Sequence, residues 1–323
     1  MMDQTISSFP QQLSWIPDIT GRFDSGAFTS YVVCGMGGSH LAADILKRLK
    51  PTLNLIVHSD YDLPLLKESS KQSRLVIASS YSGNTEETIT SFNQALAQGC
   101  SVAAITTGGR LLELAQDKDV PYIKLPVTGI QPRSALGYSL RALLKILGQT
   151  DLLEQTAQLA DTLKATDWRS KGQTLAETIK GKVPLIYASA RNYALAYNWK
   201  IKLNETGKIP AFYNLLPELN HNEMTGFAYT DLSKPLSSQF YFIMLADQRD
   251  EAGVQTRMRV LTEVLEGLGL PVITVAVEGD SETVRVFNSL ILADWLAYYT
   301  ALQYGAEPEQ VPLVEQFKKK LKP

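Results

Sequence analysis

The feature that most constrains the fold is a regular alternation of short apolar, β-branched runs with longer helical patterns. Apolar runs without polar alternation are typical of strands buried on both faces, which occur in parallel sheets covered by helices. In the first half the predicted strands are Tyr31–Cys34, Leu53–Val57, Leu75–Ser79, Val102–Thr106 and Tyr122–Leu125. The helices predicted between them are Ser39–Leu49, Thr85–Gln98 and Leu111–Gln116. The sequence therefore predicts an α/β fold with a doubly wound parallel sheet and right-handed crossovers.

The same alternation restarts after a helical stretch, Ser134 to about Lys180, that contains no strong strand pattern. The predicted strands of the second half are Leu185–Ala188, Ala211–Tyr213, Phe240–Leu245 and Val272–Val275. The predicted helices are Asn192–Glu205, Glu251–Leu268, Glu282–Tyr304 and a final Val311–Leu321. A chain of 323 residues is too long for one small core. We therefore expect two α/β domains, residues 1–152 and 153–323, with the boundary placed to within about ten residues.

Charge and hydropathy exclude several classes of function. The formal net charge is −2, from 31 Lys+Arg and 33 Asp+Glu. This balance gives no electrostatic reason to expect nucleic acid or an anionic membrane as a partner. No apolar run approaches the roughly 20 residues that span a bilayer. Residues 1–15 lack the basic and then apolar pattern of a signal peptide, so we expect a cytoplasmic protein.

The cysteines and histidines indicate no metal site. Cys34 and Cys100 flank apolar runs and are expected to be buried thiols at strand edges. His40, His58 and His221 are far apart in sequence and show no zinc-ligand spacing. We therefore expect neither a metal nor a cofactor.

Two loops between a predicted strand and a predicted helix suit a phosphate. One is residues 35–39, GMGGS, and the other is residues 79–85, SSYSGNT. Glycines let the backbone approach an anion, and helix N-termini favour negative charge. The hydroxyls that could donate further hydrogen bonds are Ser39, Ser80, Ser82 and Thr85. A nucleotide P-loop pattern is absent. The alternative is that the glycines make turns and the hydroxyls cap helices.

A carboxylate and a histidine in the second half suit proton transfer. Glu205 ends a predicted helix immediately before a glycine-containing turn. His221 lies in a polar cluster, Glu218 to Glu223. A carboxylate with a histidine is the minimum equipment for moving a proton next to a carbonyl.

These segments carry a resemblance. SYSGNT, residues 80–85, resembles the phosphate loop of sugar isomerase (SIS) domains, which isomerases, amino-sugar enzymes and sugar-phosphate sensors share. Residues 199–227, WKIKLNETGKIPAFYNLLPELNHNEMTGF, closely resemble the bifunctional phosphoglucose/phosphomannose isomerases, whose signature is NE..K.PA followed by PE.NHNE. The resemblance covers nearly the whole chain. It implies two SIS-type subdomains joined by helices, a C-terminal helical tail, and metal-independent isomerisation of glucose 6-phosphate and mannose 6-phosphate to fructose 6-phosphate through a cis-enediol.

The resemblance also implies a role for each site residue. Glu205 is expected to shuttle the proton between C1 and C2, and Arg133 to stabilise the enediolate. His221 is expected to assist ring opening in the neighbouring subunit of a homodimer, and Lys318 of the tail to aid that step. The substrate phosphate is expected to bind the Gly38 N–H and the hydroxyls of Ser39, Ser80, Ser82 and Thr85.

The chain departs from the family pattern at His40, where a small residue is usual, and at Trp295 in the last long helix. We expect His40 to affect the phosphate loop and Trp295 to affect packing near the tail. Two other functions stay open, namely an amino-sugar-phosphate SIS enzyme and a non-catalytic sugar-phosphate sensor. A sensor has no need of the Glu205, His221 and Lys318 set, which favours an enzyme.

Overall fold

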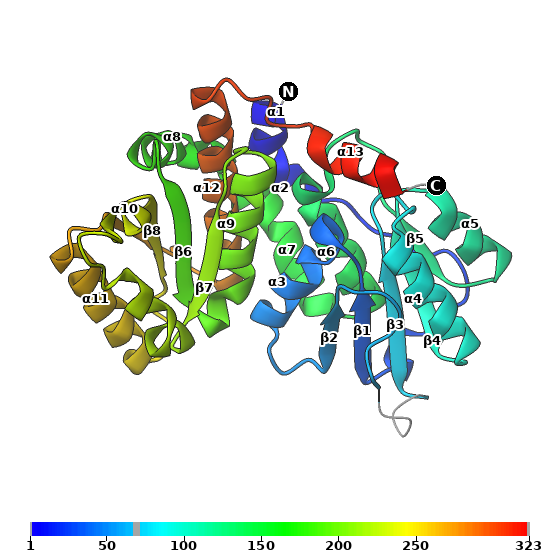
Figure 1. The fold of residues 1–323 in the computed structure, drawn as a ribbon. Coiled ribbons are helices and arrows are strands. Elements are labelled where there is room, and N and C mark those ends of the chain that lie inside the picture. Colours follow the sequence, from blue (N-terminus) through cyan, green and yellow to red (C-terminus); the bar gives the residue numbers. More distant parts are fainter. Residues whose placement is uncertain (1, 67–71, 322–323) are drawn as a thin grey trace. The chain divides into compact units, whose positions relative to one another are not determined.

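The structure, a computed structural model, describes residues 2–66 and 72–321 (Figure 1). These residues form two compact units, one of residues 8–163 and one of residues 164–321 together with residues 2–7. The predicted division after residue 152 lies inside helix α7 (Thr150–Thr162). The whole of α7 belongs to the first unit because it packs on α6 (Leu136–Ile146), where Arg141 donates to the Leu153 carbonyl at 2.8 Å.

The N-terminal unit is built on the predicted parallel sheet. Its strands are β1 (Ser30–Cys34), β2 (Leu55–His58), β3 (Arg74–Ser79), β4 (Ser101–Thr106) and β5 (Tyr122–Lys124). All pair in parallel, in the order β2-β1-β3-β4-β5. Figure 1 shows α3 and α6 on one face of this sheet and α4 and α5 on the other. Their bounds are α3 Leu41–Leu49, α4 Glu86–Ala97 and α5 Gly109–Asp117.

The strand order creates a switch point in this unit. From β1 the chain crosses to β2 on one side, and then to β3 on the other side of β1. Ligands of open α/β sheets bind outside the carboxyl ends of the strands at such a point. The loops that follow β1 and β3 there are the two hydroxyl-bearing loops of residues 35–39 and 79–85.

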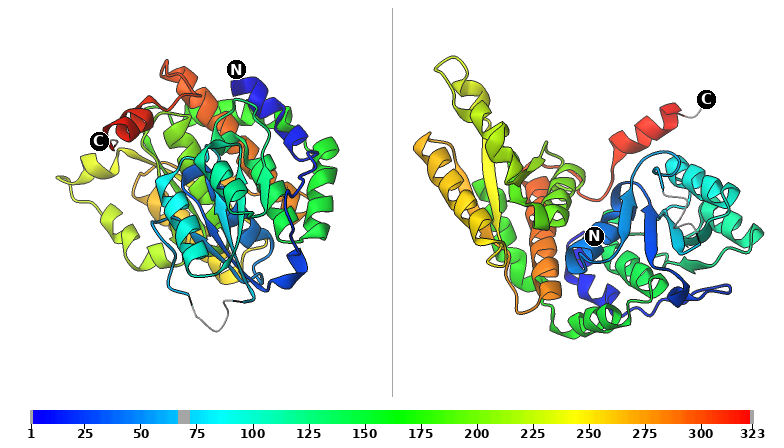
Figure 2. Two further views of the ribbon diagram at one scale, coloured as in Figure 1. Left: turned by 90° about the vertical axis from the view of Figure 1, so that its right-hand side faces the viewer. Right: turned by 90° about the horizontal axis from the view of Figure 1, so that it is seen from below.

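The C-terminal unit repeats this plan with a smaller parallel sheet. Its strands are β6 (Val183–Ser189), β7 (Phe212–Leu216), β8 (Phe240–Ala246) and β9 (Val272–Ala276), in the order β7-β6-β8-β9. Figures 1 and 2 show α11 on one face and α9 with α12 on the other. Helices of this unit are α1 (Met2–Ser7), α8 (Arg169–Thr178), α9 (Tyr193–Glu205), α10 (Lys234–Ser237), α11 (Ala252–Gly267), α12 (Glu282–Gln303) and α13 (Pro312–Leu321).

Two short helices near the N-terminus, α1 and α2 (Phe9–Gln12), were not predicted. Helix α1 buries only Met2 and Ile6, through which it packs on α12. Two apolar residues in a polar segment are too few to give a recognisable helical pattern. Among the described residues no helix combines the length and the apolar character needed to cross a membrane.

Trp295 lies where α8 packs on α12, and its ring is fully buried. The indole N–H donates to the Ala165 carbonyl at 2.7 Å. A Cβ added to Gly172 of α8 would lie 2.4 Å from the Trp295 Cβ, so only glycine permits this approach. Beside it, Lys202 and Asp294 form a buried ion pair at 2.5 Å. The unusual Asp294–Trp295 pair therefore fixes the helix layer of the C-terminal unit.

Both cysteines are buried free thiols, as predicted. Burial raises the pKa of the Cys34 thiol to about 12, and a hydrogen bond with Ser91 offsets only part of that shift.

Candidate active site

The loop after β1 is locked to the loop after β3. The Ser79 hydroxyl donates to the Ser39 carbonyl at 2.7 Å, and the Ser39 Oγ accepts from the Tyr81 N–H at 3.0 Å. A Cβ at Gly35 would lie 2.7 Å from the Ser79 carbonyl oxygen, and Gly37 has a φ of +53°. Glycine is therefore required for this close approach and for the turn into the short 3-10 helix η2 (Gly37–Ser39).

The second loop gathers its hydroxyls by bonds within itself. Ser80 is fully buried, and its Oγ lies 2.9 Å from the Thr85 Oγ1 and accepts from the Gly83 N–H at 3.1 Å. Thr85 is the N-cap residue of α4, but its side chain makes no capping hydrogen bond. The capping alternative therefore does not hold for Thr85. Ser82 is exposed, and its Oγ accepts from the Asn84 N–H at 3.3 Å.

Arg133 comes to these loops from a third segment, the 3-10 helix η4 (Pro132–Ser134). The arginine is almost completely buried. A Cβ at Gly38 would lie 2.8 Å from both the Arg133 nitrogen and the Pro132 Cβ, so η2 and η4 touch through their backbones. The N-terminal unit thus brings Gly38, Ser39, Ser80, Ser82, Thr85 and Arg133 to one edge of its sheet.

His40 follows the first loop but its side chain runs along α3. Its Nδ1 lies 2.8 Å from the Asp44 Oδ2, and both side chains are buried. The expected influence of His40 on the phosphate loop therefore passes through the first turn of α3.

In the C-terminal unit, Glu205 is the last residue of α9. Lys208, at a φ of +57°, donates its ammonium to the carbonyl of Glu205 and to the carbonyl of Gln310 at the base of the tail. The Glu307 carboxylate accepts from the Gln310 N–H at 2.6 Å. The end of the helix that carries Glu205 and the start of the tail are therefore tied together.

His221 and Lys318 lie on two other segments of this unit. His221 ends the 3-10 helix η7 (Glu218–His221) and is exposed. Lys318 lies on α13, whose described residues are not buried, and donates to Glu315 at 3.0 Å. The structure thus links Glu205 to the tail, whereas His221 and Lys318 are both exposed to solvent.

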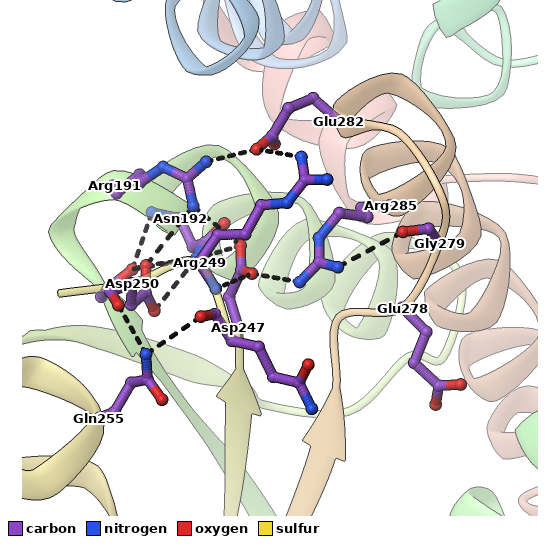
Figure 3. Close-up of polar contacts among 12 residues, drawn as sticks. Arg191, Asn192, Asp247, Arg249, Asp250, Gln255, Glu278, Gly279, Glu282 and Arg285 are labelled. Atoms are coloured by element: carbon purple, nitrogen blue, oxygen red, sulfur yellow. Dashed lines mark hydrogen bonds and ion pairs between the residues drawn. The ribbon is translucent and has the colours of Figure 1, made fainter. Parts of the chain in front are cut away.

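A charged cluster occupies the switch point of the second sheet, and the sequence did not predict it (Figure 3). Asp247, directly after β8, has a side chain with no exposed surface. It pairs with Arg285 and, at 3.1 Å, with Arg191, and it accepts from the Arg249 N–H at 2.9 Å. Burial alone would raise the pKa of Asp247, but the hydrogen bonds donated to its carboxylate and the Arg285 charge hold that pKa below its ordinary value.

The rest of the cluster balances these charges. Glu282 accepts from Arg191 at 2.6 Å and from Arg249 at 2.8 Å, and Asp250 accepts from the Ser189 hydroxyl at 2.7 Å. Three arginines therefore face three carboxylates at the place where the first sheet has its hydroxyl loops. A cavity of about 570 Å³ beside α11 is lined in part by Asp247 and Asp250. The sequence signal that could have revealed the cluster is the two aspartates, Asp247 and Asp250, within four residues of the end of β8.

Known proteins resemble this chain in sequence and in fold. A family model described as the bacterial phospho-glucose isomerase C-terminal SIS domain matches residues 169–321. A bifunctional phosphoglucose/phosphomannose isomerase of Aquifex aeolicus is 32% identical over 328 residues, covering 99% of this chain and 98% of that protein. A D-glucosamine-6-phosphate 4-epimerase of Sulfolobus acidocaldarius is 34% identical over 223 residues, covering 68% of this chain and 69% of that protein.

The fold is also that of solved structures. A hypothetical protein from Thermus thermophilus superimposes with a TM-score of 0.72 at 16% identity, covering 99% of this chain and 88% of that one. At this identity the likeness concerns the fold alone.

Proposed function

The chain belongs to the bifunctional phosphoglucose/phosphomannose isomerase family, and we propose that it interconverts glucose 6-phosphate and mannose 6-phosphate with fructose 6-phosphate through a cis-enediol. The observation that carries the proposal is the set of three loops at one sheet edge, where hydroxyls adjoin a buried arginine. The phosphate binds the hydroxyl loops, and the reacting carbons lie toward Arg133. The reaction needs no metal, because a fixed guanidinium can carry out the electrostatic role of one.

The hydrogen bonds of the loops leave hydroxyl protons available for a phosphate, and the Ser80–Thr85 pair uses one of its two protons in its own hydrogen bond. Ser39 Oγ accepts from the Tyr81 N–H, and Ser80 Oγ accepts from the Gly83 N–H. A hydroxyl that accepts a backbone N–H still has its own proton to donate. The phosphate oxygens take these protons together with the Gly38 N–H.

Catalysis moves one proton between adjacent carbons. His221 and Lys318 assist opening of the sugar ring, which gives the free carbonyl. The Glu205 carboxylate takes the proton from C2 of the aldose and returns it to C1, while the hydroxyl proton on O2 is transferred to O1. The charge that develops on the enediolate oxygens is stabilised by Arg133, a cation at any working pH.

Assembly and location are part of the proposal. We take the enzyme to be a two-fold homodimer in which His221 serves the site of the partner subunit. Its sugar 6-phosphate substrates are doubly charged and do not cross bilayers, which supports a cytoplasmic enzyme.

The second candidate is an amino-sugar-phosphate enzyme. It is favoured by the relative named as a D-glucosamine-6-phosphate 4-epimerase, which is similar over two thirds of this chain. Both candidates use the hydroxyl loops for the phosphate, so they differ in which carbon reacts.

The test is a set of coupled assays on protein dialysed against EDTA. Fructose 6-phosphate is followed to glucose 6-phosphate and, separately, to mannose 6-phosphate, and glucosamine 6-phosphate is examined for a change at any carbon. Glu205→Gln should lower both isomerase rates by about 100-fold or more. Glu177→Gln, at an exposed carboxylate of α8, is the matched control and should leave them unchanged. Turnover of glucosamine 6-phosphate alone would replace the first candidate by the second.

A further inference from the structure

The segment that carries His221 is fixed to the second sheet by apolar anchors on both sides. Leu219 is fully buried and Phe227, at the end of the 3-10 helix η8 (Glu223–Phe227), is almost so. Both pack into the core cluster that contains Tyr187 and Phe242. The Phe227 and Phe242 rings meet edge to face, with centroids 4.8 Å apart. Between the anchors His221 itself is exposed, so packing does not set its position directly.

A polar clamp lies between the two anchors. The Glu223 Oε1 accepts from the Tyr187 hydroxyl at 2.6 Å, and its Oε2 accepts from the Asn214 side-chain amide. Tyr187 of β6 and Asn214 of β7 are register partners in the parallel sheet. One carboxylate therefore bridges two adjacent strands at the same level. Burial and the nearby carboxylate raise the pKa of Tyr187, so its hydroxyl keeps the proton that it donates.

The clamp reaches His221 through one intervening residue. The Asn222 Oδ1 accepts from the Glu223 N–H at 2.6 Å, and its Nδ2 donates to the Glu218 carboxylate at 2.9 Å. Asn222 thereby closes the turn in which His221 lies. The backbone of His221 is held by this turn on one side and by buried Leu219 on the other.

We propose that Glu223 is a positioning residue that fixes His221 by tying its segment to Tyr187 and Asn214. This inference rests on the proposed function, because it assigns Glu223 a role only through His221. Both carboxylate oxygens of Glu223 are engaged by donors from the sheet, so the group holds the segment and does not touch the sugar.

The experiment is a double-mutant cycle on the full-length protein, with kcat and KM for fructose 6-phosphate measured for Glu223→Ala, His221→Ala and the double variant. Alone, Glu223→Ala should lower kcat by about 10- to 100-fold and leave KM within about two-fold, the effect of a misplaced catalytic group. In the His221→Ala background it should cause no further loss, because residues that act through one group are not additive. Glu177→Ala is the control and should leave kcat and KM unchanged in both the wild-type and the His221→Ala backgrounds.

A second cycle combines Tyr187→Phe with His221→Ala. The change at Tyr187 is smaller, because it removes one hydroxyl and keeps the buried ring. It should lower kcat by about 3- to 10-fold, the worth of one hydrogen bond, and only where His221 is present. Thermal unfolding shows whether each variant is folded, and Tyr187→Phe carries the test if Glu223→Ala is not.

Losses that multiply in the double variant would overturn the proposal, since Glu223 would then act independently of His221. An unchanged kcat for both Glu223→Ala and Tyr187→Phe would do the same. Full activity of His221→Ala would remove the role of His221 and that of Glu223 with it. In that case the loss or survival of activity in Glu205→Gln decides separately whether the isomerase proposal stands.

Discussion

Gly38→Ala should damage the proposed active site by separating two loops. The added Cβ would lie 2.8 Å from the Arg133 nitrogen, 2.8 Å from the Pro132 Cβ and 2.9 Å from the Pro132 carbonyl carbon. Ordinary contacts of a Cβ begin at 3.4 Å, so the η2 and η4 backbones must part by 3.4 − 2.8 = 0.6 Å to restore one. Overpacking of this kind costs about 1–3 kcal/mol. A shift approaching 1 Å in a catalytic group lowers the rate by up to about 100-fold.

The assay is conversion of fructose 6-phosphate to glucose 6-phosphate, with thermal unfolding in parallel. We expect Gly38→Ala to lower kcat by about 10- to 100-fold, because Arg133 moves, and to lower the Tm. Gly253→Ala is the matched control, since a Cβ there meets no atom within 4 Å and the residue is helical. That change should keep full activity and add about 0.5–1 kcal/mol of stability. Wild-type kcat and Tm in Gly38→Ala would refute the argument that the two loops shape the site by close approach.

Two further predictions concern titratable groups. Asp247→Asn should destabilise the C-terminal unit by about 3–5 kcal/mol in urea denaturation, because Arg191 and Arg285 lose a buried partner. The folded-state pKa of Asp247 is depressed, so its stabilisation is present above the unfolded pKa of about 3.9 and is lost as the pH falls through the folded value. Acid unfolding of Asp247→Asn with the midpoint of wild type would contradict this. Cys34, with a pKa of about 12, should not react with a thiol reagent at about pH 8 until the protein unfolds. Modification at the rate of a free thiol would show that the core around Cys34 opens in the folded protein.

The strands and the two hydroxyl-bearing loops that follow them could be predicted because their signals are local. A strand buried on both faces is a continuous apolar run, and β4 (Ser101–Thr106) differs from its prediction by one residue. Glycines and hydroxyls at strand ends likewise lie within a few residues of one another. The division between the units was harder, because α7 is polar along most of its length and only its contacts with α6 assign it.

The clamp around His221 could not be predicted from sequence. Glu223 meets Tyr187 across 36 positions of chain, and Asn214 joins them only because β6 and β7 pair in one particular register. No periodicity or motif encodes a register of parallel strands. The approach of Gly38 to Arg133 has the same origin, since a sheet edge brings together segments that are remote in sequence.

The two switch points differ in what natural variation they can accept. Under the proposed function the first binds the substrate phosphate, so its hydroxyl residues can change only as far as phosphate binding allows. In the charged cluster around Asp247 the charges of three arginines and three carboxylates balance. Arg285 and Asp247 are both buried, so relatives of this chain that change Arg285 should change Asp247 as well. Among related sequences we therefore expect paired replacements in the charged cluster of the second sheet. At the hydroxyl loops of the first sheet we expect each residue to be kept.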